Sequence, residues 1–454
     1  MRKVTLSVAT TALLLTGACG GAEPQESSAA ATLTFWTPHT TPDRLAVQQS
    51  VAAKFTSKTG IKVEVVPLES KQASQSLVTG AASGTLPDVI LYSPNLIAAW
   101  NAQGLMDTEA PRQIVDELGA DTFTESAIRM ATVGGKLGAV PSDGWGHVIS
   151  YRKDLFKSAG LEAPESVEDI VTAAQKLAKD GVRGIAMGTQ PGDGYTGEGL
   201  ESLLQAAGCQ LVTNGTVAID SPECVTGLDA VQKLGAAAGT GELDVGAARA
   251  AYLAGDAAML LFSSHIVDEV AGLDKDNPVT CQECKKDATY LAENTGFVTA
   301  LGTAPQYGQT SNYAIPRGAS VENAKKFVSF AMSEGYVEML STAAEGRIPM
   351  RPGPAKGSTE YLDAWADLPV GNDPATKKSI KAVYGEDVVD QLAKGAASFG
   401  RWGWGTDDAT LAGVVFSQGT LSKELGPLFS GTSPADVAKK MAAEVDSVKQ
   451  DLGE

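Results

Sequence analysis

The sequence predicts an α/β protein with two domains, and three observations support this fold class. Short apolar or alternating runs are each followed by a stretch with helical periodicity, and this strand–helix order repeats, as in a parallel sheet covered by helices. About 420 residues follow the N-terminal leader, more than one hydrophobic core normally holds. After the leader, no apolar stretch is long enough to cross a membrane.

The leader has the composition of an export signal. Arg2 and Lys3 precede the apolar run 4–15, and the small residues 17–19 (Gly-Ala-Cys) follow it. The apolar run is too short for a mature transmembrane helix. We therefore expect residues 1–18 to be a signal peptide that is removed during export.

The residue after the expected cleavage point is a cysteine, which resembles a bacterial lipoprotein signal. Cys19 would become the lipidated N-terminus, although Thr16 occupies the position where such signals prefer leucine. The alternative is an ordinary secretion signal that exports a soluble protein. Residues 19–31 have no apolar periodicity and are expected to form a flexible tether.

The chain is strongly acidic. It has 36 basic and 54 acidic residues and a formal net charge of −18, which becomes about −20 when Arg2 and Lys3 leave with the signal peptide. This balance argues against binding to nucleic acid or to an anionic membrane surface. It does not by itself indicate a cationic ligand, because acidic surfaces usually serve solubility.

Four cysteines remain after Cys19, and an even number in an exported chain favours disulfides. Pairing of sequence neighbours would join Cys209 to Cys224 and Cys281 to Cys284. The Cys281-Gln-Glu-Cys284 motif could instead be a redox site, but it lies in a polar, loop-like segment. It could also be half of a zinc site, but Cys209 and Cys224 would then complete it at a spacing that matches no common pattern.

The first block, residues 32–141, alternates strands with helices. Its first helix has clear end signals: Thr41 is a candidate N-cap, Pro42 and Asp43 suit the first turn, and Gly60 ends the helix. The uniformly apolar run 89–91 is typical of a strand buried on both faces. The predicted strands are 32–36, 61–65 and 89–91, and the predicted helices are 42–58, 71–82 and 94–103.

The second block begins after residue 141. Ser166 and Asp169 form a capping box, and the helix that follows is expected to end at Gly181. The last hundred residues are mostly helical in pattern. Further predicted strands are 148–151, 184–187 and 312–316, and further predicted helices are 200–207 and 320–332.

Six segments in this order resemble family 1 extracellular solute-binding proteins of ABC importers, the group that includes maltose-binding protein. Each segment alone is unspecific, but together they cover almost the whole chain after the leader. They are LTFWTPHTTPD (33–43), GTLPDVILYSPNLIAAWNAQGLMD (84–107), GKLGAVPSDGWGHVISYRKDLF (135–156), GDAAMLLFSSH (255–265), SNYAIPRGASVENAKKFVSFAMS (311–333) and EGRIPMR (345–351).

The resemblance implies a two-lobe type II periplasmic-binding-protein fold with a hinge of crossing segments. Lobe 1 would comprise residues 32–141 and 297–344, and lobe 2 residues 142–296 and 345–454. The crossings would lie near residues 139–142, 296–300 and 343–346. In this family the lobes close on a ligand by hinge bending, which the transmembrane subunits of the importer detect. We expect a monomer that meets the membrane only through its lipid anchor.

Ligands of open α/β sheets sit beyond the carboxyl ends of the strands. This rule selects Trp36 and His39 after the first strand, and Tyr92, Ser93 and Asn95 after the third. A sugar needs a flat apolar surface for its C–H faces and planar polar groups for its hydroxyls. Trp36 and Tyr92 could equally be core residues, because each adjoins an apolar strand.

The crossover and the later loops supply similar mixtures. Trp145 lies between glycines, which favours ligand stacking over core packing, and Asp143 could accept hydrogen bonds from sugar hydroxyls or cap the hinge. Of Trp402 and Trp404, which the resemblance places where relatives carry a stacking tryptophan, one is expected to stack and the other to pack. The remaining candidates, each with a purely structural alternative, are Ser264, His265, Asn312 and Arg347.

Residues 192–197 (Gly-Asp-Gly-Tyr-Thr-Gly) match the GxGxxG pattern of dinucleotide-binding loops. However, Asp193 would repel pyrophosphate, and the expected acidic partner, Asp220, lies too far along. We interpret the glycines as a loop that carries Tyr195 and Glu198 toward the cleft, and we expect no cofactor.

Residue types do not indicate an enzyme. The chain has three histidines and no HExxH, GxSxG or P-loop motif. The sequence therefore favours capture of a mono- or oligosaccharide for an ABC importer. Another small polar solute, such as a polyol phosphate or an oligopeptide, and a cell-surface glycan hydrolase are the alternatives.

Overall fold

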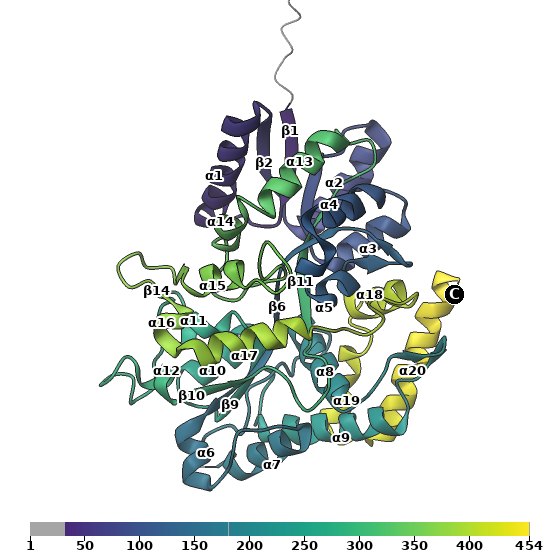
Figure 1. Cartoon of the computed structure of the whole chain (residues 1–454). Coiled ribbons are helices and arrows are strands. Elements are labelled where there is room, and N and C mark those ends of the chain that lie inside the picture. The colour runs from purple at the N-terminus through teal and green to yellow at the C-terminus, as the bar shows by residue number, and fades with distance from the viewer. Residues whose placement is uncertain (1–31, 180, 454) are drawn as a thin grey trace, which may run out of the picture.

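A 13-residue strand, β6 (Val140–Arg152), runs through both lobes of the protein (Figure 1). The computed structural model describes residues 32–179 and 181–453, so the expected signal peptide and the whole expected tether, Cys19 included, lie outside the described residues. The first half of β6 pairs with β11 (Gly308–Ala314) in lobe 1, and the second half pairs with β9 (Met259–Ser263) and β10 (Thr295–Val298) in lobe 2.

The sheet of lobe 1 has the order β6-β11-β3-β1-β2. The strands β1 (Thr32–Thr37), β2 (Lys62–Pro67) and β3 (Val89–Tyr92) are parallel, as predicted. The expected all-parallel sheet is wrong for β11, which runs antiparallel between β3 and β6 because the chain re-enters lobe 1 from the opposite direction.

Helices cover both faces of this sheet (Figure 1). The core between β1 and the helices contains Phe35, Phe55 and Phe327, whose neighbouring rings lie 5.3 Å apart. The helices of lobe 1 are α1 (Pro42–Thr59), α2 (Ser70–Ser83), α3 (Pro94–Ala102), α4 (Glu109–Leu118), α5 (Glu125–Met130), α13 (Val321–Ala331) and α14 (Tyr336–Leu340).

Lobe 2 surrounds the second half of β6. Ser166 caps α7 as predicted, since its hydroxyl accepts the Asp169 N–H at 3.1 Å. The helices of lobe 2 are α6 (Lys153–Ala159), α7 (Val167–Leu177), α8 (Gly194–Ala206), α9 (Pro222–Ala237), α10 (Val245–Leu253), α11 (Ile266–Val270), α12 (Tyr290–Asn294), α19 (Leu425–Phe429) and α20 (Pro434–Leu452).

The remaining elements lie at the junction or form short hairpins. The strand β12 (Ile348–Pro349) joins the lobe 1 half of β6, and α17 (Glu386–Ala397) crosses the middle of the molecule (Figure 1). The others are α15 (Glu360–Ala366), α16 (Ile380–Tyr384) and α18 (Ala409–Ser417); the hairpins β4–β5 (Thr132–Val133, Lys136–Leu137), β7–β8 (Val212–Thr213, Thr216–Val217) and β13–β14 (Pro369–Val370, Lys378–Ser379); and the 3-10 turns Ala120–Thr122 and Ser422–Glu424.

The crossings differ slightly from the expected boundaries. Backbone pairing along β6 changes partner between Gly146 and His147, about five residues later than the expected boundary at 141. The strand β10 still pairs with the lobe 2 half of β6 through Val298, so the return to lobe 1 falls between β10 and β11. An uninterrupted strand carries no local signal for the point at which its neighbours change.

Two expectations for lobe 2 were wrong. The run 184–187 makes only isolated bridges to the β9 region rather than a strand. The glycine-rich residues 194–197 are not a loop but the first turn of α8, because the Asp193 carboxylate accepts the Tyr195 and Thr196 N–H groups and starts the helix.

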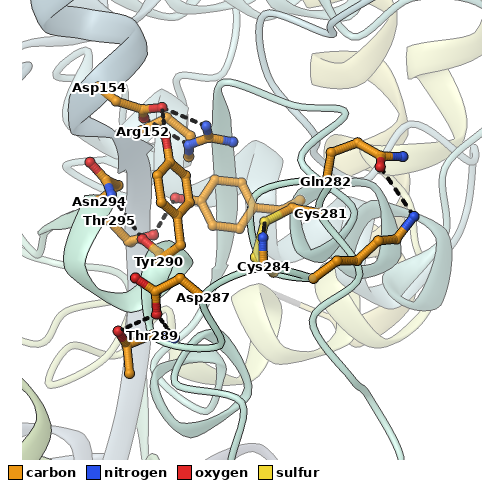
Figure 2. Close-up of a disulfide and its surroundings, with 12 residues drawn as sticks. Arg152, Asp154, Cys281, Gln282, Cys284, Asp287, Thr289, Tyr290, Asn294 and Thr295 are labelled. Carbon is orange, nitrogen blue, oxygen red and sulfur yellow. Dashed lines mark hydrogen bonds and ion pairs between the residues drawn. A yellow bond between two sulfur atoms is a disulfide. The ribbon is translucent and has the colours of Figure 1, made fainter.

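Both predicted disulfides form, Cys209–Cys224 and Cys281–Cys284. The zinc alternative is wrong, because all four sulfurs are used in these bonds. Figure 2 shows the second disulfide in its loop, beside a network in which the Tyr290 hydroxyl donates to Asp154 at 2.9 Å and Asp154 also accepts two hydrogen bonds from Arg152. The disulfide closes a tight turn, and the Tyr290 hydrogen bond ties the chain after that turn to Asp154 of α6.

Candidate functional site

The segments that connect the lobes meet at one place, and Ser264 joins them. The Ser264 hydroxyl donates to the Gly346 carbonyl at 2.7 Å, and its N–H donates to the Gly146 carbonyl at 2.8 Å. A Cβ at position 346 would come within 2.5 Å of the His265 ring, so glycine is needed for this close approach. The structure gives the buried Ser264 a positioning role at this junction.

Trp145 is the central aromatic residue of the junction. It is half-buried, and its ring centroid lies 6.1 Å from that of His147 and 6.3 Å from those of His265 and Tyr307. Half-burial is unusual for a side chain with so many aromatic neighbours, and it leaves part of the indole open to a ligand. We therefore retain Trp145 as the predicted stacking residue.

Asp143 and Arg347 form a nearly buried ion pair beside Trp145. The Arg347 Nη1 lies 3.0 Å from the Asp143 carboxylate and also donates to the Ser311 hydroxyl. Two alternatives were considered for Arg347 from the sequence: a place at the cleft, or an ion pair with an acid. Arg347 lies at the cleft and also pairs with Asp143. Asp143 keeps a carboxylate oxygen at the junction as a possible acceptor.

The imidazole rings of His39 and His265 are electrically neutral. Burial, together with the nearby guanidinium groups of Arg347 and Arg44, lowers the pKa of His39 to about 2. Burial also lowers the pKa of His265 to about 3, with the same two guanidinium groups contributing. A neutral imidazole has one donor and one acceptor nitrogen, which matches the needs of a sugar hydroxyl.

Several buried polar atoms near Trp145 have no hydrogen-bond partner in the part of the chain that the structure describes. They include the Tyr307 hydroxyl and both ring nitrogens of His147. The Glu198 carboxylate lies 3.4 Å from His147 Nε2, but the geometry of this contact is not that of a hydrogen bond. Buried polar groups are normally paired, so these atoms are candidates for pairing with a ligand or its bound water.

A cavity of about 560 Å³ opens beside this cluster, and His265 lies on its wall. Lobe 1 contributes the start of α1 and the segment after α14, and lobe 2 contributes the end of β9 and α11. The segment before the second disulfide contributes Asp274, Asp276 and Asn277. A cavity with walls from both lobes is the geometry that couples binding to closure.

Four predicted ligand contacts are packed inside the lobes instead. The Tyr92 hydroxyl donates to the Leu68 carbonyl at 2.7 Å, and the Tyr195 hydroxyl donates to the Leu261 carbonyl at 2.6 Å. Trp36 lies in the core that contains Tyr92, and the indole N–H of Trp402 donates to a backbone carbonyl in lobe 2. The polar atoms of Tyr92, Tyr195 and Trp402 are satisfied within the protein and Trp36 is buried in a core, so these four residues are not part of the proposed site.

Asn312 is also withdrawn. It is fully buried in the middle of the sheet, and its amide exchanges hydrogen bonds with Thr310 on its own strand. The backbone has a β-bulge after Ser311, and the hydrogen bonds between Asn312 and Thr310 at this bulge explain why an asparagine occupies the position.

Ser93, Asn95 and Trp404 lie where the two lobes touch. Ser93 is the residue before α3, and Asn95 on α3 accepts a hydrogen bond at 3.3 Å from Arg401 of the late segment. Arg401 is itself held by a buried ion pair with Glu201 on α8, at 2.8 Å. Trp404 packs against Ala98 of α3 and Ala409 of α18, so it fills the contact rather than a ligand site.

Sequence reasoning missed His147, Tyr307, Arg44 and the acids Asp268 and Glu269. The two acids follow His265 by three and four residues, which places them one helical turn beyond it. That spacing was a usable signal. The sequence around Tyr307 contains no such signal, because Tyr307 precedes β11, which begins at Gly308, and its neighbours are set by tertiary packing.

Among the described residues, the structure contains no helix that is both long and apolar enough to traverse a bilayer. The same part of the chain has no group of three or more histidine, cysteine or acidic side chains arranged to hold a metal ion.

Comparison with known proteins agrees with this architecture. The chain is 26% identical over 297 residues to a putative ABC transporter periplasmic-binding protein, YcjN, of Escherichia coli, covering 63% of this chain and 65% of that protein. The chain therefore spans just under two thirds of the length of this curated relative.

Solved structures match over a greater length. The GacH receptor of Streptomyces glaucescens has a TM-score of 0.67 at 19% identity, and the alignment covers 93% of this chain and 99% of that chain. The cyclic alpha-maltosyl-1,6-maltose binding protein of Arthrobacter globiformis has a TM-score of 0.71 at 17% identity, with the same coverage. These similarities establish the two-lobe fold.

Residues 50–370 match the family described as bacterial extracellular solute-binding protein. This match includes β2, β3, all of β6, β11 and most of the cavity wall, whereas β1 and the start of α1 precede it. The chain belongs to the bacterial extracellular solute-binding protein family.

Proposed function

We propose that this chain captures a mono- or oligosaccharide, or a related polyol, between its lobes and delivers it to the transmembrane subunits of an ABC importer. The observation that carries the proposal is the convergence at the junction of a half-exposed indole, two neutral imidazoles and an Asp–Arg pair beside a 560 Å³ cavity. Indoles stack on sugar C–H faces, and the polar groups suit hydroxyls.

The similar proteins support the choice of ligand class. The GacH receptor was solved with acarbose, and the Arthrobacter protein is a binding protein for a cyclic maltosyl-maltose. The family consists of binding proteins, and we propose non-covalent capture without turnover. Delivery would follow from closure, since a ligand that contacts both lobes stabilises the closed state.

The structure also disfavours a phosphate ligand. A phosphate needs free, convergent cations, whereas Arg347 is paired with Asp143 and Arg44 with Glu345 at 2.6 Å. Binding a phosphorylated polyol would have to break one of these pairs.

The test is a thermal-shift screen with mono- and disaccharides and polyols, followed by calorimetry on the best ligand. We expect Trp145→Ala to weaken binding about fivefold or more, because a stacked aromatic ring contributes about 1 kcal/mol or more. Tyr151→Ala is the matched control, since Tyr151 is a half-buried aromatic residue on the same strand but packs on Phe156 in lobe 2.

Two results would refute the proposal. One is the absence of stabilisation by any carbohydrate or polyol, and the other is a Trp145→Ala variant that binds as well as Tyr151→Ala. Release of products from a glycan library would favour the hydrolase alternative.

We further propose that the protein is extracytoplasmic and anchored through Cys19, which lies outside the described residues. The support is the Gly-Ala-Cys sequence after the apolar leader. A Cys19→Ser variant is expected to leave the membrane fraction and appear in the soluble exported fraction, whereas an unchanged distribution would favour ordinary secretion.

A further inference from the structure

The cavity beside the junction has an excess of carboxylates. Six acidic side chains line it, against the cationic side chains Arg44, Arg249 and Lys377. Arg44 is paired with Glu345 at 2.6 Å, and Arg249 with Glu269 at 3.1 Å. The acidic residues are Asp43, Asp268, Glu269, Asp274, Asp276 and Glu345.

Asp268 is the most unusual of these acids. The residue is only 6% exposed, and among the described residues its carboxylate forms no ion pair and accepts a hydrogen bond from the Glu269 N–H. Its neighbour Glu269 is equally buried, and the Oε2 atom of Glu269 has no partner among these residues. Unpaired carboxylates at this depth are normally avoided, because a buried charge needs a compensating partner.

The surroundings of Asp268 make its ionisation unfavourable in the absence of a cation. Burial, together with the nearby carboxylates of Glu345, Glu269 and Asp274, raises its pKa to about 8. Burial likewise raises the pKa of Glu269 to about 7, although Arg249 opposes this. The six carboxyl groups of the cavity thus outnumber its three cationic side chains by three.

We infer that the cavity binds a positively charged amino group of the solute, so that the preferred ligands are amino sugars or similar aminated carbohydrates. Asp268 would accept from the ammonium group, with Glu269 and Glu345 adding negative potential. This inference rests on the proposed function and narrows its ligand class.

The position of the acids relative to Trp145 fits this ligand. His265 lies on the cavity wall, and its ring centroid is 6.3 Å from that of Trp145. Asp268 follows His265 by three residues, on α11. A sugar stacked on Trp145 could therefore extend past His265 and place a substituent at Asp268.

An inorganic cation fits less well. A metal site needs three or more converging ligands, and none of the described residues form such a group. An ammonium group needs only two or three acceptors and can use the carboxylate oxygens of Asp268 and Glu269.

The test uses sugars that differ only in the group at carbon 2 of each ring. Calorimetry would compare chitobiosamine with cellobiose and with N,N′-diacetylchitobiose, and glucosamine and galactosamine with glucose and galactose. We expect at least one amine to bind about tenfold or more tightly than its neutral analogues, because a hydrogen bond to a charged group is stronger than a neutral one. Asp268→Asn should remove this advantage, and Asp256→Asn, an exposed acid away from the cavity, should keep it.

A second readout is independent of affinity. If the ammonium group ionises Asp268, binding at pH 7 should release protons, measurable as a dependence of the binding enthalpy on the buffer. The release should be lost in Asp268→Asn.

The possible outcomes separate the inference from the proposed function. Neutral sugars that bind as tightly as their amines, or an amine preference that persists in Asp268→Asn, would overturn the inference and leave carbohydrate capture intact. Failure of every sugar, charged or neutral, would overturn both.

Discussion

The buried ion pair between Arg401 and Glu201 gives the sharpest test of how the late segment is attached to lobe 2. The side chains are 3% and 6% exposed, and two hydrogen bonds of 2.8 and 3.2 Å join them. Replacing Arg401 with methionine keeps much of the volume but leaves the Glu201 carboxylate buried without its cation. Such a change costs about 3–5 kcal/mol of unfolding free energy.

The surroundings of Glu201 and Arg401 narrow this expected range of lost unfolding free energy. Glu201 would keep the hydrogen bonds from the Trp402 N–H at 3.0 Å and the Gln205 amide at 2.9 Å, which moderates the loss. Arg401 also stacks on Phe416 and Tyr307, and this contribution would disappear. We expect Arg401→Met to lower the unfolding free energy by about 3 kcal/mol.

Urea denaturation followed by circular dichroism measures this change, with three comparison variants. Asn95→Ala removes only the contact to lobe 1, and should cost about 1 kcal/mol or less. Adding Glu201→Met to Arg401→Met should restore most of the lost stability, because no buried charge then remains. Arg112→Met breaks an exposed pair and should change nothing measurable. An Arg401→Met variant as stable as Arg112→Met would refute the reasoning.

Three further predictions follow from the junction and the disulfides. Gly346→Ala should weaken ligand binding at least tenfold in calorimetry, because its Cβ would displace His265 from the junction; unchanged affinity would contradict this role. The pKa of His39 is lowered to about 2 in the folded chain. As the pH falls below 6.5, His39 therefore takes up a proton in the unfolded chain but not in the folded chain. The parent should thus lose up to about 2 kcal/mol more stability than His39→Asn between pH 7 and pH 5, and parallel denaturation curves would contradict this. Replacing Cys209 and Cys224 together by serine should cost about 3 kcal/mol, given a sequence separation of 15, and a denaturation midpoint equal to that of the parent would oppose this value.

Much of lobe 1 could be predicted from the sequence because its signals are local. Gly60 ends α1 in the left-handed conformation, and the apolar run before Tyr92 is a strand buried on both faces, both as predicted. The two disulfides followed from neighbour pairing. Each of these features depends on a few consecutive residues.

The site was harder to predict because it depends on which side of an element faces the junction. Trp145 was identified because flanking glycines made core packing unattractive, whereas Trp402 and Tyr195 stand in equally suggestive contexts and are buried in lobe 2. Asp193 starts α8 earlier than expected, and the rotation of that helix turns Tyr195 inward. Only the packing of α8 on β9 decides this orientation.

The acids Asp268 and Glu269 show the same limit. Their spacing from His265 was visible, but acidic residues after a strand usually face solvent. Their significance comes from depth and from missing partners, which are properties of the folded chain.

A crystal structure of the protein with the sugar that gives the largest thermal shift tests the central claim most directly. The account predicts an intact sugar at the junction of the lobes, stacked on Trp145 and touching residues of both lobes. A sugar that is cleaved, or that sits on one lobe away from Trp145, would contradict it.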